Sequence, residues 1–247
     1  MDLPGVAEAV TRVGDAVSAV HRHPANRRGW PAIAAEAAVR AARASAALDG
    51  GSATVPSDGS VRDPVLAGAL RVAQSLGGML GTWRRAPLQA LARLHVLAAA
   101  DLSAEPGLGR PGLGRPGLGR PDPPFELTAR LEGLARLVTE GSQVAAPVLV
   151  AVVHGELLAL APFAHGNGVV ARAAARLTVV SSGLDPKALV VPEVAHLHRE
   201  LEYRATAIGF AKGGAEAVGE WIVHCCTALS AGAREAIVIA DATAESS

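Results

Sequence analysis

Residues 161–172 read APFAHGNGVVAR and connect two apolar segments that each have the pattern of a helix. The preceding segment, 147–160, is almost entirely aliphatic, and the following helix is expected over 169–180. Arg172 and Arg176 are four residues apart, a spacing that places both on one face near the start of that helix. The sequence therefore predicts two helices joined by a short glycine-rich loop.

The loop itself suggests a place where an anion can bind. Gly166 and Gly168 let the backbone approach another molecule closely, and the free amides at a helix N-terminus attract negative charge. Arg172, one turn into the helix, can reach the same anion. Gly-Asn-Gly around Asn167 is also a common turn, so these residues taken alone favour an ordinary helix entry.

The wider stretch resembles the signature of the Fic (Fido) family, His-Pro-Phe-x-Asp/Glu-Gly-Asn-Gly-Arg-x-x-Arg. The matching positions are Pro162, Phe163, Gly166, Asn167, Gly168 and Arg172. Three positions that carry chemistry in the family are changed: Ala161 replaces the histidine, His165 the acidic residue and Val169 the first arginine. The resemblance implies an all-α fold, a Fic/Fido helical core with an N-terminal helical extension.

The three changes bear on catalysis. In the family, the histidine takes a proton from a target Ser, Thr or Tyr hydroxyl as the hydroxyl attacks the α-phosphate of ATP. Ala161 cannot accept a proton, and a positioned general base contributes about 10²–10⁴-fold. The family's acidic residue holds Mg²⁺, which prefers oxygen ligands to the imidazole of His165. Val169 removes a guanidinium that stabilises phosphate charge.

The resemblance thus implies a phosphate-binding loop without efficient AMP transfer. Its binding residues would be Gly166, Asn167, Gly168 and Arg172. No catalytic residue is expected, since Ala161 occupies the base position, and His165 is a weak candidate for a substitute base. ATP is a possible ligand, and Mg²⁺ is expected to bind weakly or not at all.

A second motif lies at the end of a helix expected over 30–48. Gly50 is placed as its C-terminal cap, but Ser45, Asp49 and Gly50 also resemble the Fic inhibitory motif Ser/Thr-x-x-x-Glu-Gly/Asn. In the family this acid pairs with the second signature arginine and obstructs the γ-phosphate of ATP. Asp49 is one methylene shorter than glutamate, so its reach to Arg172 is left open.

The expected organisation is an N-terminal helical extension with the inhibitory-type motif over 1–60 and a degenerate Fic domain over 61–247. Further helices are expected over 4–20, 63–83, 86–100 and 130–138, and residues 236–240 as a short strand or helix end. The loop at 106–124 contains Pro-Gly-Leu-Gly-Arg three times. Proline and glycine disfavour helix and strand there, whereas Fic proteins carry a β-hairpin flap in this region.

Composition excludes several other classes. Half of the 247 residues are hydrophobic but only 3% are aromatic, which favours closely packed helices rich in alanine. Lys+Arg and Asp+Glu both total 23, so neither nucleic acid nor a membrane surface is an expected partner. Segment 147–160 is too short to span a bilayer, and no signal peptide is evident. A cytoplasmic protein is expected.

Cysteine and histidine spacing predicts no metal site. Cys225 and Cys226 are adjacent within a helical segment, so both are expected to be reduced. His196 and His198 would point to different sides of a helix. His95 and His154 are interpreted as structural core histidines.

Three functions stay open at this point. The preferred one is a degenerate Fic protein that binds a nucleotide or an unknown protein partner. The second is a residual enzyme that transfers a nucleotidyl or phosphoryl group to a protein hydroxyl, with His165 as its base. The third is a structural interaction module whose pocket is filled by Val169 and Asp49.

Overall fold

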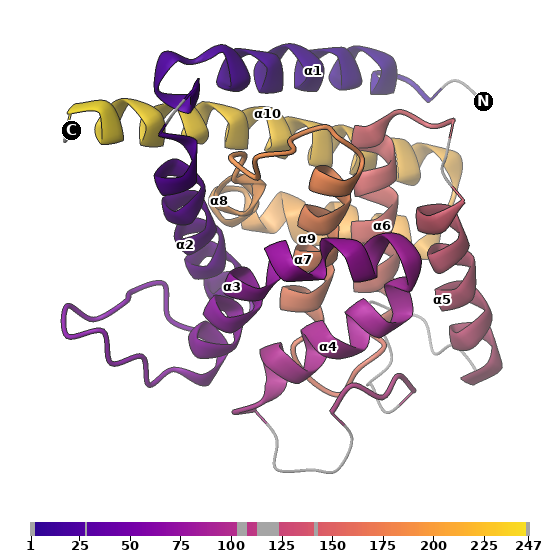
Figure 1. Cartoon of the computed structure of the whole chain (residues 1–247). Coiled ribbons are helices and arrows are strands. Elements are labelled where there is room, and N and C mark those ends of the chain that lie inside the picture. Colours follow the sequence, from indigo (N-terminus) through magenta and orange to yellow (C-terminus); the bar gives the residue numbers. More distant parts are fainter. Residues whose placement is uncertain (1–2, 28, 103–107, 113–123, 141–142, 246–247) are drawn as a thin grey trace.

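The computed structural model describes residues 3–27, 29–102, 108–112, 124–140 and 143–245. These ranges contain helices joined by loops, and no strand (Figure 1). The elements are α1 (Val6–Arg22), η1 (Pro24–Arg27), α2 (Trp30–Leu48), α3 (Pro64–Arg85), α4 (Pro87–Ala99), α5 (Pro124–Thr139), α6 (Ala146–Leu160), α7 (Asn167–Ser181), α8 (Pro192–His198), α9 (Glu200–Lys212) and α10 (Ala215–Glu245). The predicted all-α fold is confirmed.

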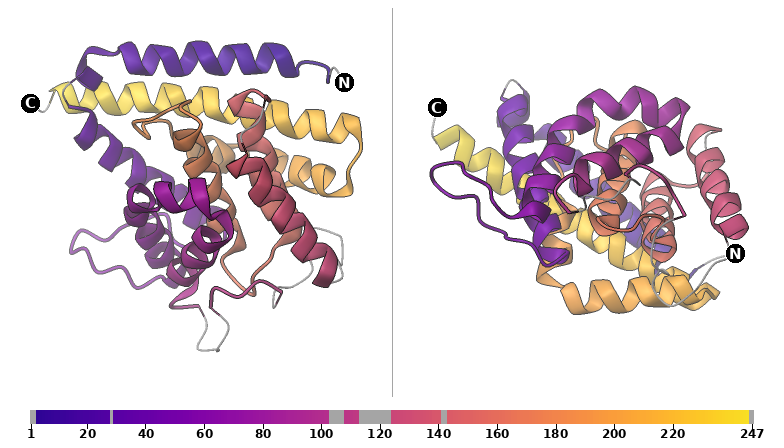
Figure 2. Two further views of the ribbon diagram at one scale, coloured as in Figure 1. Left: turned by 45° about the vertical axis from the view of Figure 1, so that its right-hand side comes forward. Right: turned by 90° about the horizontal axis from the view of Figure 1, so that it is seen from below.

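The longest of the described helices, α10, lies between α1 and the other helices, and α1 runs along it in Figure 1 and in the left view of Figure 2. The valines that recur along α1 explain this contact. Val13, Val17 and Val20 are at most 3% exposed and belong to the same core as Ile239 of α10. Because these valines recur at three- and four-residue intervals, they form one apolar stripe that α10 covers.

A second core surrounds the glycine-rich loop and α7. Trp83 from α3, Leu94 from α4, Phe163 from the loop and Leu177 from α7 are all fully buried there. Helix α6 packs against both α7 and α10 and so lies between the two cores. The loop is therefore fixed by buried neighbours on several helices.

The last described helix decides between two alternatives for residues 236–240 and extends the one that it favours. Residues 236–240, expected as a short strand or helix end, lie inside the 31-residue helix α10. Ala236, Ile239 and Ala240 are at most 1% exposed, so a buried face continues through them. Of the described helices, α10 alone is long and apolar enough to cross a bilayer. However, 56% of its apolar 18-residue stretch is buried in the fold, as in a core helix.

Two expectations on chain organisation stay predictions. The boundary at residue 60 falls in the connection between α2 and α3, yet α1 and α2 share the two cores with the helices that follow. The repeat loop at 106–124 lies largely outside the described residues, which include only 108–112 of its interior.

Candidate functional site

The loop between α6 and α7 is held by a side chain from its own end. Asn167 Oδ1 accepts a hydrogen bond from the Phe163 amide at 2.9 Å, and Asn167 Nδ2 donates to the Phe163 carbonyl at 2.6 Å. Two residues with positive φ bound the turn, Ala161 at 40° and Gly166 at 69°. Asn167, predicted as a binding residue, thus shapes the loop from within.

Beneath the loop, His95 stacks on Phe163 with ring centroids 4.1 Å apart and planes 9° from parallel. Its Nδ1 accepts a hydrogen bond from the Gly109 amide at 2.8 Å, and Gly112 donates to the Pro162 carbonyl. Burial and the neighbouring His165 lower the pKa of His95. His95 is 2% exposed, so it is a core histidine, as expected, and it supports the loop directly.

The N-terminus of α7 already faces an anion, and the anion belongs to the protein. Asp49 Oδ2 accepts a hydrogen bond from the Val169 amide at 3.0 Å, while Asp49 Oδ1 lies 2.7 Å from Nη2 of Arg172. The carboxylate therefore occupies the position where helix amides and a guanidinium both favour negative charge. Aspartate is long enough to reach Arg172.

Arg172 is buried, with 3% of its surface exposed, and most of its N–H donors form hydrogen bonds. Nε donates to Ser45 Oγ at 2.8 Å, Nη2 donates to the Ser45 carbonyl and to Asp49, and Nη1 donates to Tyr203 Oη at 3.3 Å. Burial opposes its charge, but the charge of Asp49 and the hydrogen bonds of Asp49 and Tyr203 raise the pKa of Arg172 above its ordinary value. Arg172 is therefore charged and is held by α2, with its C-terminal cap Asp49, and by α9.

Two glycines make this contact possible. A Cβ on Gly168 would lie 2.2 Å from Asp49 Oδ1, so a larger residue would displace the carboxylate. At the end of α2, Gly50 has a φ of 82°, and the Gly51 amide donates to the Ala46 carbonyl. This glycine-dependent turn directs Asp49 toward α7.

A pocket of about 350 Å³ opens beside the pair. It is lined by Leu48, Asp49, Leu158, Ala161, Asn167, Gly168, Arg172, Tyr203, Arg204, Ala207 and Ile208. The volume falls within the range of about 300–1,000 Å³ that is usual for small-molecule sites. Residues of the signature stretch, the end of α2 and one face of α9 thus converge on one pocket.

Two substituted signature positions do not line this pocket. The side chain of Val169 is 4% exposed and lies in the core around the loop, so it does not fill the pocket. His165 is exposed and is not among the lining residues. Ala161, by contrast, does line the pocket, at the position where the resemblance expects a catalytic base.

The described wall of the pocket contains one carboxylate, Asp49. In the described part of the chain, no group of three or more His, Cys, Asp or Glu side chains is arranged to hold a metal. Asp49, the carboxylate in the pocket wall, is engaged by Arg172 and the Val169 amide. Weak or absent Mg²⁺ binding stays a prediction.

Behind Arg172 lies a buried polar cluster that sequence analysis did not find as a unit. His154 Nε2 and Tyr203 Oη are 2.9 Å apart, and His196 Nδ1 lies 3.1 Å from His224 Nε2. Desolvation lowers the pKa of His154 and of His196 well below the ordinary value and raises the pKa of Tyr203 to about 12. These three groups are therefore neutral at pH 7.

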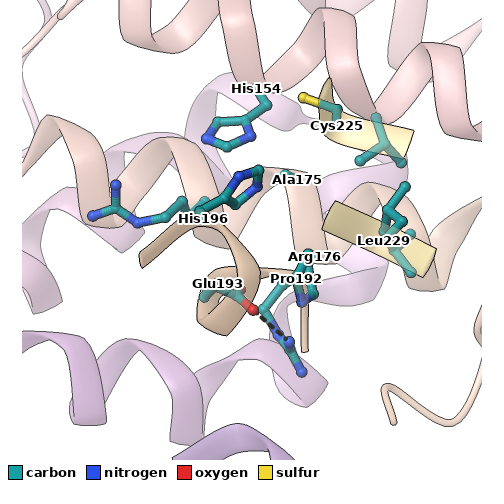
Figure 3. A pocket seen from close by; sticks show the side chains of 11 residues that line it. His154, Ala175, Arg176, Pro192, Glu193, His196, Cys225 and Leu229 are labelled. Atoms are coloured by element: carbon teal, nitrogen blue, oxygen red, sulfur yellow. Dashed lines mark hydrogen bonds and ion pairs between the residues drawn. The ribbon is translucent and has the colours of Figure 1, made fainter. Parts of the chain in front are cut away.

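The same region contains a second buried arginine (Figure 3). Arg176 Nη1 lies 3.2 Å from Glu193 Oε2 and donates to the Val190 carbonyl at 2.9 Å. Together with His154 and His196, the pair lines a small cavity of about 20 Å³, roughly the space of one water molecule. Arg176 thus has a structural partner and does not face the larger pocket.

No family model and no curated protein matches the sequence. Solved structures do resemble the fold. A Fic family protein from Desulfovibrio desulfuricans G20 has a TM-score of 0.77 at 20% identity, over 96% of this chain and 75% of that one. A fragment of Fic-1 from C. elegans has a TM-score of 0.72 at 18% identity, over 98% and 74% of the two chains. The chain therefore has the helical fold of Fic family proteins.

Proposed function

We propose, on the premise that the chain has the Fic fold, that it binds an adenine nucleotide in the pocket beside α7 and does not transfer AMP efficiently. The observation that carries this proposal is the open pocket of about 350 Å³ that meets the Asp49–Arg172 pair. In a scaffold without ligands, apolar side chains would be expected to fill that volume. Val169 instead packs into the core.

The residues that line the pocket argue against AMP transfer. Ala161 has no proton-accepting group, and His165, the candidate substitute, is exposed outside the lining. The Asp49 carboxylate, already held by Arg172 and a helix amide, competes with phosphate for the same donors. Binding without turnover fits these residues better than the residual transferase. A protein partner and a cytoplasmic location remain predictions.

Calorimetric titration with ATP and ADP tests the binding proposal. The wild-type chain and Asp49→Ala are titrated with and without Mg²⁺, and unfolding curves are used to check that the variant is folded. Binding to either protein with an affinity tighter than millimolar supports the proposal. No binding to either folded protein would overturn it and favour the structural interaction module.

Incubation with labelled ATP and Mg²⁺ tests the absence of transfer. We expect no label on the chain, and none on Ala161→His, because the family's metal ligand and first arginine are also replaced. Label on wild type that disappears in His165→Ala would establish the residual transferase instead.

A further inference from the structure

The pocket wall contains two guanidinium groups, and they differ in availability. Arg172 is 3% exposed and uses four of its five N–H donors, namely one from Nε, one from Nη1 and two from Nη2. One N–H of Nη1 is left, so an anion can bind Arg172 through two N–H donors only by displacing Ser45, Asp49 or Tyr203. While Asp49 is paired with Arg172, Arg172 therefore has little capacity to bind a ligand.

Arg204 on α9 is the second guanidinium in the wall, and it is open to solvent. Its side chain is 54% exposed, and Nε donates to Glu200 Oε1 at 2.8 Å. Nη2 lies 2.7 Å from the same Glu200 oxygen and donates to the Leu48 carbonyl at 2.7 Å, whereas Nη1 forms no hydrogen bond with any described residue. A planar guanidinium with a free Nη1 can still bind a phosphate oxygen.

The Leu48 contact fixes where this charge lies. Leu48 is the last residue of α2 and directly precedes Asp49. The Arg204 guanidinium is therefore held in the pocket wall close to the Asp49–Arg172 pair. Arg204 is outside the signature stretch, and Val169, at the signature's first arginine position, contributes no charge. A cation from α9 therefore lies in the pocket wall, although the signature's first arginine is replaced by Val169.

We infer that Arg204 recognises the anionic group of the pocket's ligand while Asp49 holds Arg172. This inference rests on the proposed function, because it assigns a contact within the same pocket. The ligand class is a phosphate-bearing molecule whose anion approaches from the α9 side. Glu200, which is 41% exposed and lies outside the lining, competes for the same guanidinium.

The test is titration of the full chain with ADP, adenosine and pyrophosphate at low salt. We expect Arg204→Ala to weaken ADP and pyrophosphate binding at least tenfold. The matched control Arg199→Ala removes one exposed charge from the start of α9, outside the lining, and is expected to leave binding unchanged. Glu200→Gln is expected to tighten binding a few-fold, because it frees Arg204.

The outcomes separate this inference from the proposed function. If ADP binds and Arg204→Ala has the same affinity as Arg199→Ala, the inference is wrong and the proposed function stands. If pyrophosphate binds through Arg204 while ADP and adenosine do not bind, the anion site stands and the nucleotide proposal is wrong. If neither ADP nor pyrophosphate binds to wild type or Asp49→Ala, both are overturned.

Discussion

Asp49 Oδ1 lies 2.7 Å from Arg172 Nη2, although the two residues are 123 positions apart in the sequence. This ion pair joins the end of α2 to the first turns of α7. The Arg172 side chain is 3% exposed and that of Asp49 is 23% exposed, so solvent screens the pair only partly. One interaction thus stabilises the fold and closes part of the pocket.

Removing the carboxylate should therefore reduce stability. Asp49→Ala leaves Arg172 buried without its counter-charge, and loss of one partner of a buried pair costs about 3 kcal/mol of unfolding free energy. Asp49→Asn should cost less, because the amide oxygen can still accept from the Val169 amide. Urea unfolding measures both, with Asp58→Ala on the neighbouring exposed loop as the control. Equal midpoints for Asp49→Ala and Asp58→Ala would contradict the pair's structural role.

Gly168→Ala should act through Asp49. In the wild-type chain, the three atoms nearest to the added Cβ belong to the Asp49 carboxyl group, so we expect a loss of about 1–3 kcal/mol. In the Asp49→Ala background those atoms are gone, and alanine gains up to about 1 kcal/mol over glycine inside a helix. A double-mutant cycle by urea unfolding measures the coupling. Additive effects would show that Gly168 is not required by the carboxylate.

Ala161 has a backbone conformation that favours glycine. Its φ of 40° and ψ of 60° are left-handed, which costs a non-glycine residue about 1–2 kcal/mol. Ala161→Gly should therefore stabilise the chain by about 0.5–1 kcal/mol after the entropy of glycine in the unfolded state is counted. The control Ala205→Gly, on the exposed face of α9, should destabilise by about 1 kcal/mol. The same sign for both substitutions would contradict the strain at Ala161.

The buried histidines should make stability depend on pH. Desolvation lowers the pKa of His154 and His196 well below 6.5, so below pH 6.5 the unfolded chain binds protons that the native chain excludes. The contribution of these two histidines to stability is then constant above that pH and falls as pH decreases toward the native pKa values, by about 1.4 kcal/mol per pH unit for each histidine. Unfolding free energies between pH 7.5 and 5.5 measure the slope. His154→Gln should reduce it, and an unchanged slope would exclude His154 as a source.

Much of the fold followed from the sequence because its patterns are local. The recurring valines of α1 and the apolar segment before Ala161 need only helical periodicity to be recognised. For residues 236–240 the sequence leaves a strand and a helix end open, because the two look alike over five residues, and the structure has them in the last part of α10. Their burial comes from distant contacts, which periodicity over so short a window does not reveal.

The candidate site also contains residues that the sequence predicts and contacts that only the structure reveals. The resemblance to the Fic signature and inhibitory motif predicts Ser45, Asp49, Gly50 and Arg172, and the structure places Ser45 and Asp49 against Arg172. The Arg176–Glu193 pair and the contact of Arg204 with the Leu48 carbonyl depend on how α7, α8, α9 and α2 cross. No spacing along the chain encodes such contacts, so three-dimensional packing was needed to find them.

The most direct test of a nucleotide pocket closed by Asp49 is the ratio of ATP to ADP affinity, measured by calorimetry for wild type and Asp49→Ala without Mg²⁺. If the carboxylate occupies the place of the terminal phosphate, wild type should bind ADP at least several-fold more tightly than ATP, and the variant should lose that preference while binding both more tightly. Equal ratios in the two proteins, or the absence of binding in both, would contradict the claim.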